Sequence, residues 1–479
     1  MDQHAKIQRN TELLFLKSAL TLQNPFNTTE EVLQWIRKRN NEVEVKVAQL
    51  PFDKMLGWGF ADKNYRLEHE SGKFFFISGI EVRTNWGEKP VWDQPIINQP
   101  EIGYLGFITR EIKGILYFLI QAKIEPGNVN YVQLSPTLQA TKSNYTQVHK
   151  GKRPSYIEYF LDRKNNQVLL DQLQSEQGAR FLKKRNRNII IKVDPQLEVL
   201  EDFCWLTLGQ IKELMKIDNV VNMDTRTVIS GIPYGSIASE ALDFSEFVGN
   251  AGNQIGKKML RSELVTDKAL FSFNQIIHWF TNLKTIYELN FNIKSLEKLQ
   301  EWDVQESRIT HKEHKYFDVI AVNVNISNRE VTSWDQPLIK PLEHGLCAFL
   351  VKEINGVIHF LVQAKVESGN FDILEMAPTV QCITGSYKNE KSFANLHFLK
   401  DVLDAEPEQL LYDTLQSEEG GRFYREQNRN LIIKVSETFP LEVPENYIWM
   451  TLNQLKKFIL FNNYLNIQAR SIISSISFN

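Results

Sequence analysis

Two stretches of the sequence carry side chains whose types and spacing suit acid–base chemistry. In each, a glutamine, a lysine and a glutamate stand at alternate positions, namely Gln121, Lys123 and Glu125 in the first and Gln363, Lys365 and Glu367 in the second. A glutamate can accept or donate a proton, and a lysine can stabilise a negatively charged oxygen. The sequence has no Gly-x-Ser-x-Gly motif and no local Cys/His signature, so it favours proton transfer over covalent catalysis.

The alternation itself predicts the element that must position these side chains. In the first stretch the intervening residues Phe118, Ile120, Ala122 and Ile124 are all apolar. Residues two apart share one face of a β-strand, so the stretch is predicted as a strand with an apolar core face and a polar face. The polar face could line a pocket or meet solvent. Its retention in both stretches favours the pocket.

Both stretches belong to a larger unit that occurs twice. The unit runs from Trp92 to Val193 and again from Trp334 to Val435, at a constant offset of 334 − 92 = 242 residues, and each unit opens with Trp-Asp-Gln-Pro. Between Gln174–Val193 and Gln416–Val435, 13 of 20 positions are identical. Agreement of this kind at one offset indicates duplication of a whole domain.

Other polar and aromatic residues recur around each strand and suit a ligand with a flat ring and a phosphate. Tryptophan can stack on a ring, amides can bind a base or sugar hydroxyls, and arginine can bind a diphosphate. A turn anchor is the alternative for the tryptophans, and an ordinary surface position is the alternative for the arginines. The predicted binding residues are Trp92, Gln94, Gln121, Asn128, Thr137, Gln139, Arg180 and Arg187 in the first copy and Trp334, Gln336, Gln363, Asn370, Thr379, Gln381, Arg422 and Arg429 in the second.

The remaining local patterns predict a mixed α/β chain of the α+β class. Apolar runs predict strands over Phe74–Val82 and Phe317–Ile326. Capping-box spacing places helix starts at Thr207 and Thr451, and the cluster from Thr28 to Glu31 marks another.

The spacing of apolar residues also favours helices over Gln174–Phe181 and Gln416–Phe423, ending near Asn186 and Asn428, with the basic run from Lys183 to Arg187 as a solvated helix end. Gly127-Asn128 and Gly369-Asn370 are expected to end the strands at positive φ.

These elements divide the chain into two large domains with flanking segments. Residues 1–30 are expected to form an arm or first helix, 31–230 the first repeat, 231–272 a connecting segment, and 273–479 the second repeat. Apolar content of 42% in 479 residues is ample for two cores.

Composition excludes several kinds of protein. A net charge of −3 over both copies gives no basic surface for nucleic acid. The three cysteines are widely spaced and odd in number, which supports neither a disulfide framework nor a zinc knuckle. His311 and His314 are read as a solvent-exposed charged turn rather than a metal site. The chain begins with polar residues and its apolar runs are too short for a membrane helix, so a soluble cytoplasmic protein is expected.

Several longer motifs resemble the NDP-hexose 2,3-dehydratases of deoxysugar biosynthesis. They are Trp-Asp-Gln-Pro-Ile-Ile from Trp92, Gln-Ala-Lys-Ile-Glu-Pro-Gly-Asn from Gln121, the segment from Gln133 to Tyr145, and Ala-Pro-Thr-Val-Gln-Cys from Ala377. The resemblance covers nearly the whole chain, including its duplication, and is highly specific because several long motifs match together.

The resemblance implies two Nudix-like mixed-sheet domains flanked by helices, in a homodimer. It implies a dTDP-linked 4-keto-6-deoxyhexose substrate that loses its C2 hydroxyl as water, giving a 3,4-diketo-2,6-dideoxy sugar that a separate 3-ketoreductase reduces. True Nudix hydrolases need a clustered Arg-Glu-x-x-Glu-Glu metal box, which Gln174 to Arg180 and Gln416 to Arg422 do not supply. Neither a metal nor another cofactor is therefore expected.

The implied reaction suggests a role for each candidate catalytic residue. A C4 ketone acidifies the C3 hydrogen, so a base can remove it while a cation stabilises the enolate. A lysine and a glutamate that merely pair with each other are the alternative. Proton exchange is expected between Glu125 or Glu367 and Tyr145 or Tyr387, with Lys123 or Lys365 stabilising the oxyanion.

The sequence leaves open which copy is active. His359 stands where the first copy has Tyr117, and a group that titrates near neutrality slightly favours the second copy for chemistry. An active pocket with an auxiliary pocket in the other copy is the preferred division. The rival functions are a non-catalytic nucleotide-sugar binding protein and a Nudix-type pyrophosphohydrolase.

Overall fold

A computed structural model of the protein describes residues 3–61, 65–145, 153–161, 166–193, 197–237, 253–327, 331–388 and 396–479. Within these ranges the two copies form the same succession of helices and strands, and the mixed α/β duplication predicted from the sequence is confirmed. Each copy contributes one large mixed sheet and most of one small sheet. The predicted connecting segment 231–272 contains a helix, and its residues 238–252 lie outside the described ranges.

The large sheet of the first copy has the strand order β10-β11-β6-β7-β12, with β8 paired to β7 and β9 to β6. Only the β6–β11 pairing is parallel in this described sheet. The strands are β6 Gly103–Ile112, β7 Ile115–Ile124, β8 Val132–Ser135, β9 Leu138–Ala140, β10 Gln167–Ser175, β11 Arg185–Lys192 and β12 Phe203–Thr207.

The second copy repeats this sheet in the order β20-β19-β18-β23-β22, with β21 paired to β18 and β24 to β19. Its strands are β18 Gly345–Ile354, β19 Val357–Lys365, β20 Glu375–Ala377, β21 Val380–Cys382, β22 Leu410–Ser417, β23 Gln427–Lys434 and β24 Tyr447–Thr451.

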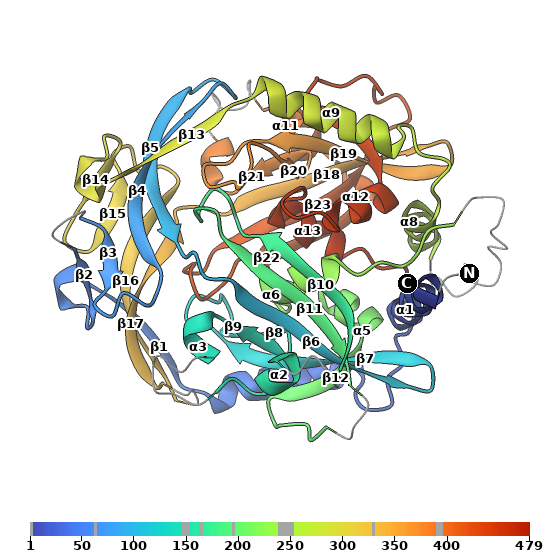
Figure 1. Ribbon diagram of the computed structural model, residues 1–479, viewed down its shortest axis with the longest axis horizontal. Coiled ribbons are helices and arrows are strands. Elements are labelled where there is room, and N and C mark those ends of the chain that lie inside the picture. Colours follow the sequence, from blue (N-terminus) through green and yellow to red (C-terminus); the bar gives the residue numbers. More distant parts are fainter. Residues whose placement is uncertain are drawn as a thin grey trace.

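Helices fill the space between the two large sheets. Figure 1 shows α6 and α13 side by side at the centre of the molecule, and apolar residues from both copies join there in one continuous core. The helices are α1 Gln3–Ala19, α2 Thr29–Glu42, α3 Lys142–Tyr145, α4 Ile157–Leu161, α5 Leu208–Leu214 and α6 Met223–Ser230 in the first copy, and α8 Gln254–Leu264, α9 Phe273–Ile286, α11 Leu399–Leu403, α12 Leu452–Ile459 and α13 Ile467–Ser474 in the second.

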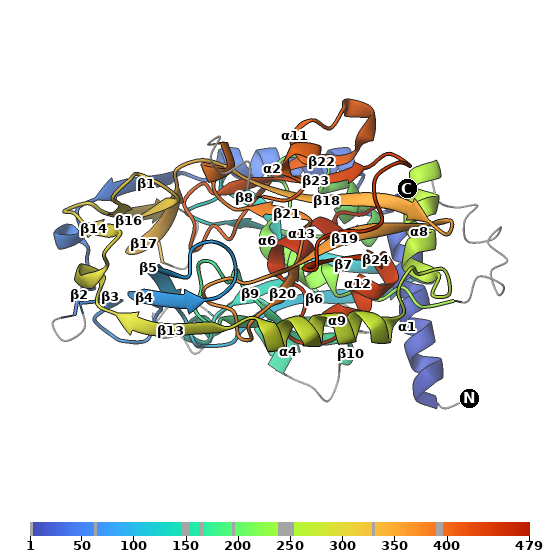
Figure 2. The same cartoon turned by 90° about the horizontal axis from the view of Figure 1, so that it is seen from above.

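The two small sheets exchange strands between the copies. The first strand of the chain, β1, runs antiparallel to β16 of the second copy, with Val45 opposite Ile326, while β13 of the second copy pairs with β4 of the first. Figures 1 and 2 show both small sheets at the end of the molecule away from the two termini. The strands are β1 Val45–Leu50, β2 Trp58–Phe60, β3 Leu67–His69, β4 Phe76–Thr84, β5 Val91–Asn98, β13 Leu289–Lys294, β14 Trp302–Val304, β15 Arg308–His311, β16 Phe317–Ile326 and β17 Ser333–Pro341. Because each small sheet needs a strand from the other copy, the copies are interlocked.

Several local predictions are confirmed. Thr28, Thr207 and Thr451 cap α2, α5 and α12, and each cap is a complete capping box in which the side chain three residues later bonds back to the threonine N–H. The predicted strands appear as β4 and β16. In β7 the side chains of Phe118, Ile120, Ala122 and Ile124 enter the core as their alternation predicts.

The helices predicted over Gln174–Phe181 and Gln416–Phe423 are wrong. Residues up to Ser175 and Ser417 complete strands β10 and β22, whose hairpin partners are β11 and β23, and the following residues form turns. The long-range ladder overrides the local spacing, since Gln174 pairs with Asn186. The basic run is not a solvated helix end either, because Lys184 is buried.

Two smaller expectations also change. His311 is buried against the Trp302 ring, at 5.3 Å between ring centroids, whereas the rest of the predicted exposed turn, from Lys312 to Lys315, faces solvent as expected. Gly127 and Gly369 do not have positive φ. Among the described helices none is long and apolar enough to cross a membrane.

Candidate active site

A cavity of about 450 Å³ opens where the two copies meet. Its floor is the polar face of β7 in the first copy, and one wall comes from the second copy, through the start of β17 and the turn after β22. We call residues 418–424 in this turn the arginine loop. Residues that line the cavity include Gln121, Lys123, Glu125, Gln139, Lys184 and Asp224 from the first copy, and Trp334, Gln336, Glu419 and Arg422 from the second.

A hydrogen-bonded network orders the floor. The Gln139 side chain donates from Nε2 to Glu125 Oε1 at 2.7 Å and accepts from Asn222 Nδ2 at 3.2 Å, and Lys123 Nζ donates to the Gln139 carbonyl at 3.1 Å. Glu125 is buried, and its second oxygen, Oε2, has no hydrogen-bond partner among the described residues. That oxygen is therefore available to accept a proton from a bound molecule.

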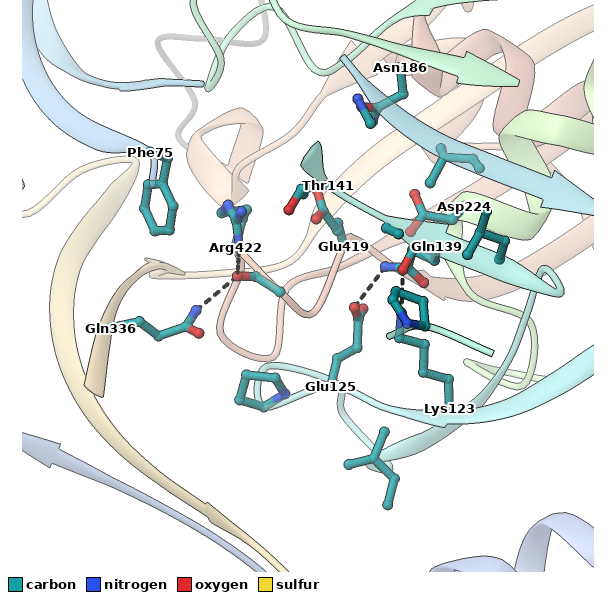
Figure 3. A pocket seen from close by; sticks show the side chains of 18 of the residues that line it. Phe75, Lys123, Glu125, Gln139, Thr141, Asn186, Asp224, Gln336, Glu419 and Arg422 are labelled. Atoms are coloured by element: carbon teal, nitrogen blue, oxygen red, sulfur yellow. Dashed lines mark hydrogen bonds between the residues drawn. The ribbon is translucent and has the colours of Figure 1, made fainter. Parts of the chain in front are cut away.

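Two more carboxyl groups face the same space. Asp224, the second residue of α6, is buried and its Oδ2 has no hydrogen-bond partner in the described part of the chain. Burial raises the pKa of Asp224 well above its usual range, Glu419, Glu125 and Glu176 raise it further, and Lys123 lowers it. Burial likewise raises the pKa of Glu419, which the Arg422 guanidinium partly opposes. Figure 3 shows Asp224, Gln139 and Glu125 grouped on one side of the cavity.

The opposite side carries the Arg422 guanidinium, and a second cation, Lys184, also lines the cavity. The Arg422 guanidinium lies 4.1 Å from the centroid of the Phe75 ring, and its Nε and Nη2 donate to Gln99 Oε1 at 3.2 and 3.1 Å. Lys184 reaches the cavity beside the Glu101 carbonyl, to which it donates. Burial lowers the pKa of Lys184, and Glu176 and Glu419 oppose that shift. This side suits an anionic group such as a phosphate.

The Trp-Asp-Gln-Pro motif supports the arginine loop. Trp334 Nε1 donates to Gln336 Oε1 at 2.7 Å, and Gln336 Nε2 donates to the Gly421 carbonyl at 2.9 Å. Ile339 N then donates to the Arg422 carbonyl at 2.9 Å. Figure 3 shows Gln336 and Arg422 on the same side of the cavity, joined through the loop backbone. The motif thus holds in place the arginine that faces the first copy.

Gly127 joins the floor to the arginine loop. Its N–H donates to the Gly420 carbonyl at 2.8 Å, and its carbonyl accepts from Arg425 N at 2.7 Å. A Cβ on Gly127 would lie 1.7 Å from the Phe423 oxygen. The reason for glycine here is the close approach of two backbones rather than the positive φ predicted from the sequence, and Gly369 has the matching contact with Phe181.

Apart from Thr137, the other predicted residues of the first copy lie outside the cavity lining. Asn128 donates to the Tyr131 carbonyl at 2.9 Å, and Arg187 forms an ion pair with Asp171 at 2.5 Å. Tyr145 packs edge-on against Tyr104 at 5.7 Å between ring centroids. Thr137 lines the cavity, but its hydroxyl accepts from Ile108 N at 2.9 Å and donates to the Leu119 carbonyl, so it holds strands together.

The second copy repeats the side-chain contacts that build this site, and we call this repeated set of contacts the second-copy frame. Gln381 donates to Glu367 at 2.8 Å, Gln94 donates to the Ala179 carbonyl at 2.9 Å, and Arg180 stacks on Phe317 at 4.1 Å. Trp92, which donates to Gln94 at 3.0 Å, corresponds to Trp334. Gln363 and Lys365 continue the polar face of β19, and the Lys365 ammonium lies 5.2 Å from the Trp86 ring centroid.

Other second-copy candidates have structural partners. His359 is fully buried, its Nε2 accepts from Leu270 N at 2.9 Å, and burial lowers its pKa to about 4. Arg429 pairs with Asp413 at 2.6 Å. Thr379 binds Leu350 N and the Leu361 carbonyl, and the Tyr387 ring packs against the core around Leu346 and Trp449. Asn370 differs, because it is buried and its Nδ2 has no hydrogen-bond partner among the described residues.

The copies differ at charged positions around the site. In the first-copy cavity stand Lys184, Asp224 and Glu419, and the matching positions around the second-copy frame hold Glu426, Gln468 and Gln177. Sequence reasoning missed all three cavity residues. Comparing the copies position by position would have pointed to Asp224 and Glu419, since charge changes there while nearby residues persist, as Asn222 and Arg226 do in Asn466 and Arg470. Lys184 gives no such signal, because the residues on both sides of it also change.

Comparison with known proteins places this geometry in a family. The sequence profile of the NDP-hexose 2,3-dehydratases matches residues 29–232 and again 273–476. The dTDP-4-dehydro-6-deoxy-alpha-D-glucopyranose 2,3-dehydratase of Saccharopolyspora spinosa is 45% identical over 473 residues, which cover 98% of this chain and 96% of that protein. Proteins of the same name from Streptomyces violaceoruber and Amycolatopsis orientalis are 38% and 39% identical, over 92% and 96% of this chain and 95% and 92% of their own lengths.

Proposed function

Because this chain belongs to the NDP-hexose 2,3-dehydratase family, we propose that its cavity binds a dTDP-linked 4-keto-6-deoxyhexose and removes the C2 hydroxyl as water. The observation that carries the proposal is the division of the cavity into two sides. Glu125 and Lys123 stand on one side and Arg422 on the other, and Lys184 also lines the cavity. An acid–base pair opposite a cation matches a sugar joined to a diphosphate.

The catalytic side supplies the groups that start an elimination. The C4 ketone acidifies the C3 hydrogen, and Glu125 Oε2, which has no hydrogen-bond partner among the described residues, takes that proton. The Lys123 ammonium, positioned by the Gln139 carbonyl, stabilises the enolate oxygen. Loss of the C2 hydroxyl leaves an enol at C3, which tautomerises to the 3,4-diketo-2,6-dideoxy sugar. No electrons leave the substrate, so no redox partner is consumed.

The cationic side holds the nucleotide. Arg422 is fixed by Phe75 and Gln99, so little side-chain freedom is lost when it binds the diphosphate. Trp334 lines the same cavity and offers an aromatic surface for the thymine ring. Both residues come from the second copy, whereas Glu125 and Lys123 come from the first. The proposed active site is therefore shared between the copies.

Mass spectrometry of the products tests the reaction. The protein is incubated with dTDP-4-keto-6-deoxyglucose, and we expect the substrate mass to fall by one water. Release of dTMP would instead support a Nudix-type pyrophosphohydrolase, and an unchanged substrate would support a binding protein.

Matched variants test which copy acts. In Glu125→Gln we expect dehydration to slow by about 10²- to 10⁴-fold, the usual contribution of a general base. Glu367→Gln, the same change in the second copy, should retain activity within a few-fold. The opposite ranking would assign the chemistry to the second copy.

The family resemblance also motivates proposals about the surroundings of the reaction. A diketo product is reactive, so a 3-ketoreductase that reduces it should act directly afterwards. We propose that the enzyme works as a homodimer in the cytoplasm. Sedimentation of the purified protein would show whether the mass in solution is twice that of one chain.

A further inference from the structure

The proposed dehydration needs a second proton-transfer group. Once Glu125 holds the C3 proton, the C2 oxygen must gain a proton to leave as water, since hydroxide is a poor leaving group. Tyr145, the partner predicted from the sequence, does not line the cavity and packs its ring against Tyr104. The donor must therefore be sought among the cavity residues.

Asp224 has the required position. It lies on the first turn of α6, lines the cavity, and stands on the same side as Glu125 in Figure 3. Although it is only 3% exposed, its Oδ2 has no hydrogen-bond partner among the described residues. A buried polar oxygen without a partner is costly unless a bound molecule satisfies it.

The charges around Asp224 favour its protonated form. Burial is the main cause of its raised pKa. Glu419 and Glu176 from the two turns and Glu125, directly after β7, raise the pKa further, while Lys123 from β7 opposes them. A protonated carboxyl beside a second carboxylate is the arrangement in which two like groups divide acid and base roles.

The second copy shows that the fold does not need this carboxyl. The matching residue on α13 is Gln468, although the helix keeps its cap, in which Asn466 accepts from Ala469 N at 3.0 Å as Asn222 accepts from Thr225 N at 2.9 Å. The buried arginines after the two caps, Arg226 and Arg470, also persist. An acid at position 224 is thus specific to the cavity.

We propose that Asp224 is the general acid that protonates the departing C2 hydroxyl, an inference that rests on the proposed dehydratase function. Glu125 first takes the C3 proton, which leaves the enolate that Lys123 stabilises. The Asp224 carboxyl proton then passes to the C2 oxygen, and the enolate electrons form the C2–C3 double bond as the C2–O bond breaks with its electrons on oxygen. In the tautomerisation, the Asp224 carboxylate accepts the enol proton and Glu125 returns its proton to C2. Both residues end in their starting forms.

Deuterium exchange separates this role from the others. Asp224→Asn and wild type are each incubated with dTDP-4-keto-6-deoxyglucose in D₂O, and both the product and the recovered substrate are analysed. We expect Asp224→Asn to dehydrate at least about 100-fold more slowly. Glu125 remains intact, so the recovered substrate should still gain deuterium at C3. The control Gln468→Asn, on the matching helix, should dehydrate at the wild-type rate.

Each of the remaining results would refute either the acid role of Asp224 or the proposed dehydratase function. Dehydration by Asp224→Asn within about five-fold of wild type would refute the acid role. Loss of both dehydration and C3 exchange, with dTDP still bound, would show that Asp224 acts in deprotonation or positioning. If Asp224→Asn does not fold, Asp224→Gln, which installs the residue of the second copy, gives the same readouts, and failure of both to fold would assign Asp224 a structural role. Failure of wild type to dehydrate would refute the proposed function itself.

Discussion

Replacing Gly127 by alanine should damage the junction that completes the cavity. The added methyl carbon would lie 1.7 Å from the Phe423 carbonyl oxygen and 2.7 Å from the Gly420 carbonyl oxygen. Carbon–oxygen contacts in proteins are about 3.3 Å or longer, so the two backbones must separate by about 3.3 − 1.7 = 1.6 Å. Backbone oxygens cannot rotate away as a side chain can, so the arginine loop itself must move.

The cost follows from the contacts that this separation breaks. Two hydrogen bonds link Gly127 to Gly420 and Arg425, and each contributes about 0.5–1.5 kcal/mol. Overpacking of a well-filled interior adds about 1–3 kcal/mol. Gly127→Ala should therefore lower the free energy of unfolding by about 2–6 kcal/mol, and it should raise KM for the nucleotide sugar because Arg422 is displaced.

Guanidinium denaturation followed by tryptophan fluorescence measures the first effect, and initial rates at varied substrate concentration measure the second. Gly59→Ala is the matched control, since a Cβ at Gly59 would have no atom within 4 Å. A Gly127→Ala protein as stable as Gly59→Ala would refute the close approach of the two backbones. A large loss of stability with an unchanged KM would refute the link to Arg422.

Two further results are expected from the site and its twin. In Arg422→Ala, loss of a charge-assisted contact of about 1.5–3 kcal/mol should weaken dTDP binding by about 10- to 150-fold in calorimetry, whereas Arg180→Ala should not weaken binding at the first-copy cavity to that extent. The pKa of His359 falls from 6.5 to about 4 on folding. Its contribution to stability is therefore fully present above pH 6.5 and is lost as the pH falls through about 4, by up to about 3 kcal/mol. His359→Gln, whose side-chain oxygen can accept from Leu270 N, should flatten the pH dependence of unfolding between these values, and an unchanged dependence would show that another group dominates.

The sequence predicted the elements whose evidence is local. The alternation in β7 placed Gln121, Lys123 and Glu125 on one face, because side-chain direction along a strand depends only on residue parity. The caps at Thr207 and Thr451 were likewise correct, since a capping box is complete within four residues. Predictions of this kind need no knowledge of what packs against the element.

Predictions failed where distant partners decide the structure. Arg180 and Arg422 were expected on helices, but both lie in turns after strands whose pairing is set by residues about ten positions further on. Each turn is also held by backbone hydrogen bonds from the other copy, at Gly369 and Gly127. Periodicity within a window of one helix carries no information about such contacts.

Local sequence patterns also did not predict which copy supplies each wall of the site. The sequence repeats every motif once per copy, which suggests that Trp92, Gln94 and Arg180 surround the strand of their own copy. In the structure Trp334, Gln336 and Arg422 line the cavity whose floor bears Lys123 and Glu125. A tandem repeat specifies what each unit contains, but only the packing of the units decides which copy supplies which wall.

Because both copies line the same cavity, substitutions in either copy can make the two copies differ in chemistry. A substitution in the second copy, such as Glu419 where the first has Gln177, alters the cavity of the first copy because the arginine loop crosses the junction. The copies also differ within the first-copy lining itself, since Lys184 has Glu426 at the matching position. A lysine can attract a diphosphate, whereas Glu426, whose pKa burial raises to about 8, offers no cation at the matching position. The frame of stacked arginine and amide-bound glutamate is thus common to both copies, while the residues proposed to bind an anion and to donate a proton, Lys184 and Asp224, are replaced by Glu426 and Gln468 in the other copy.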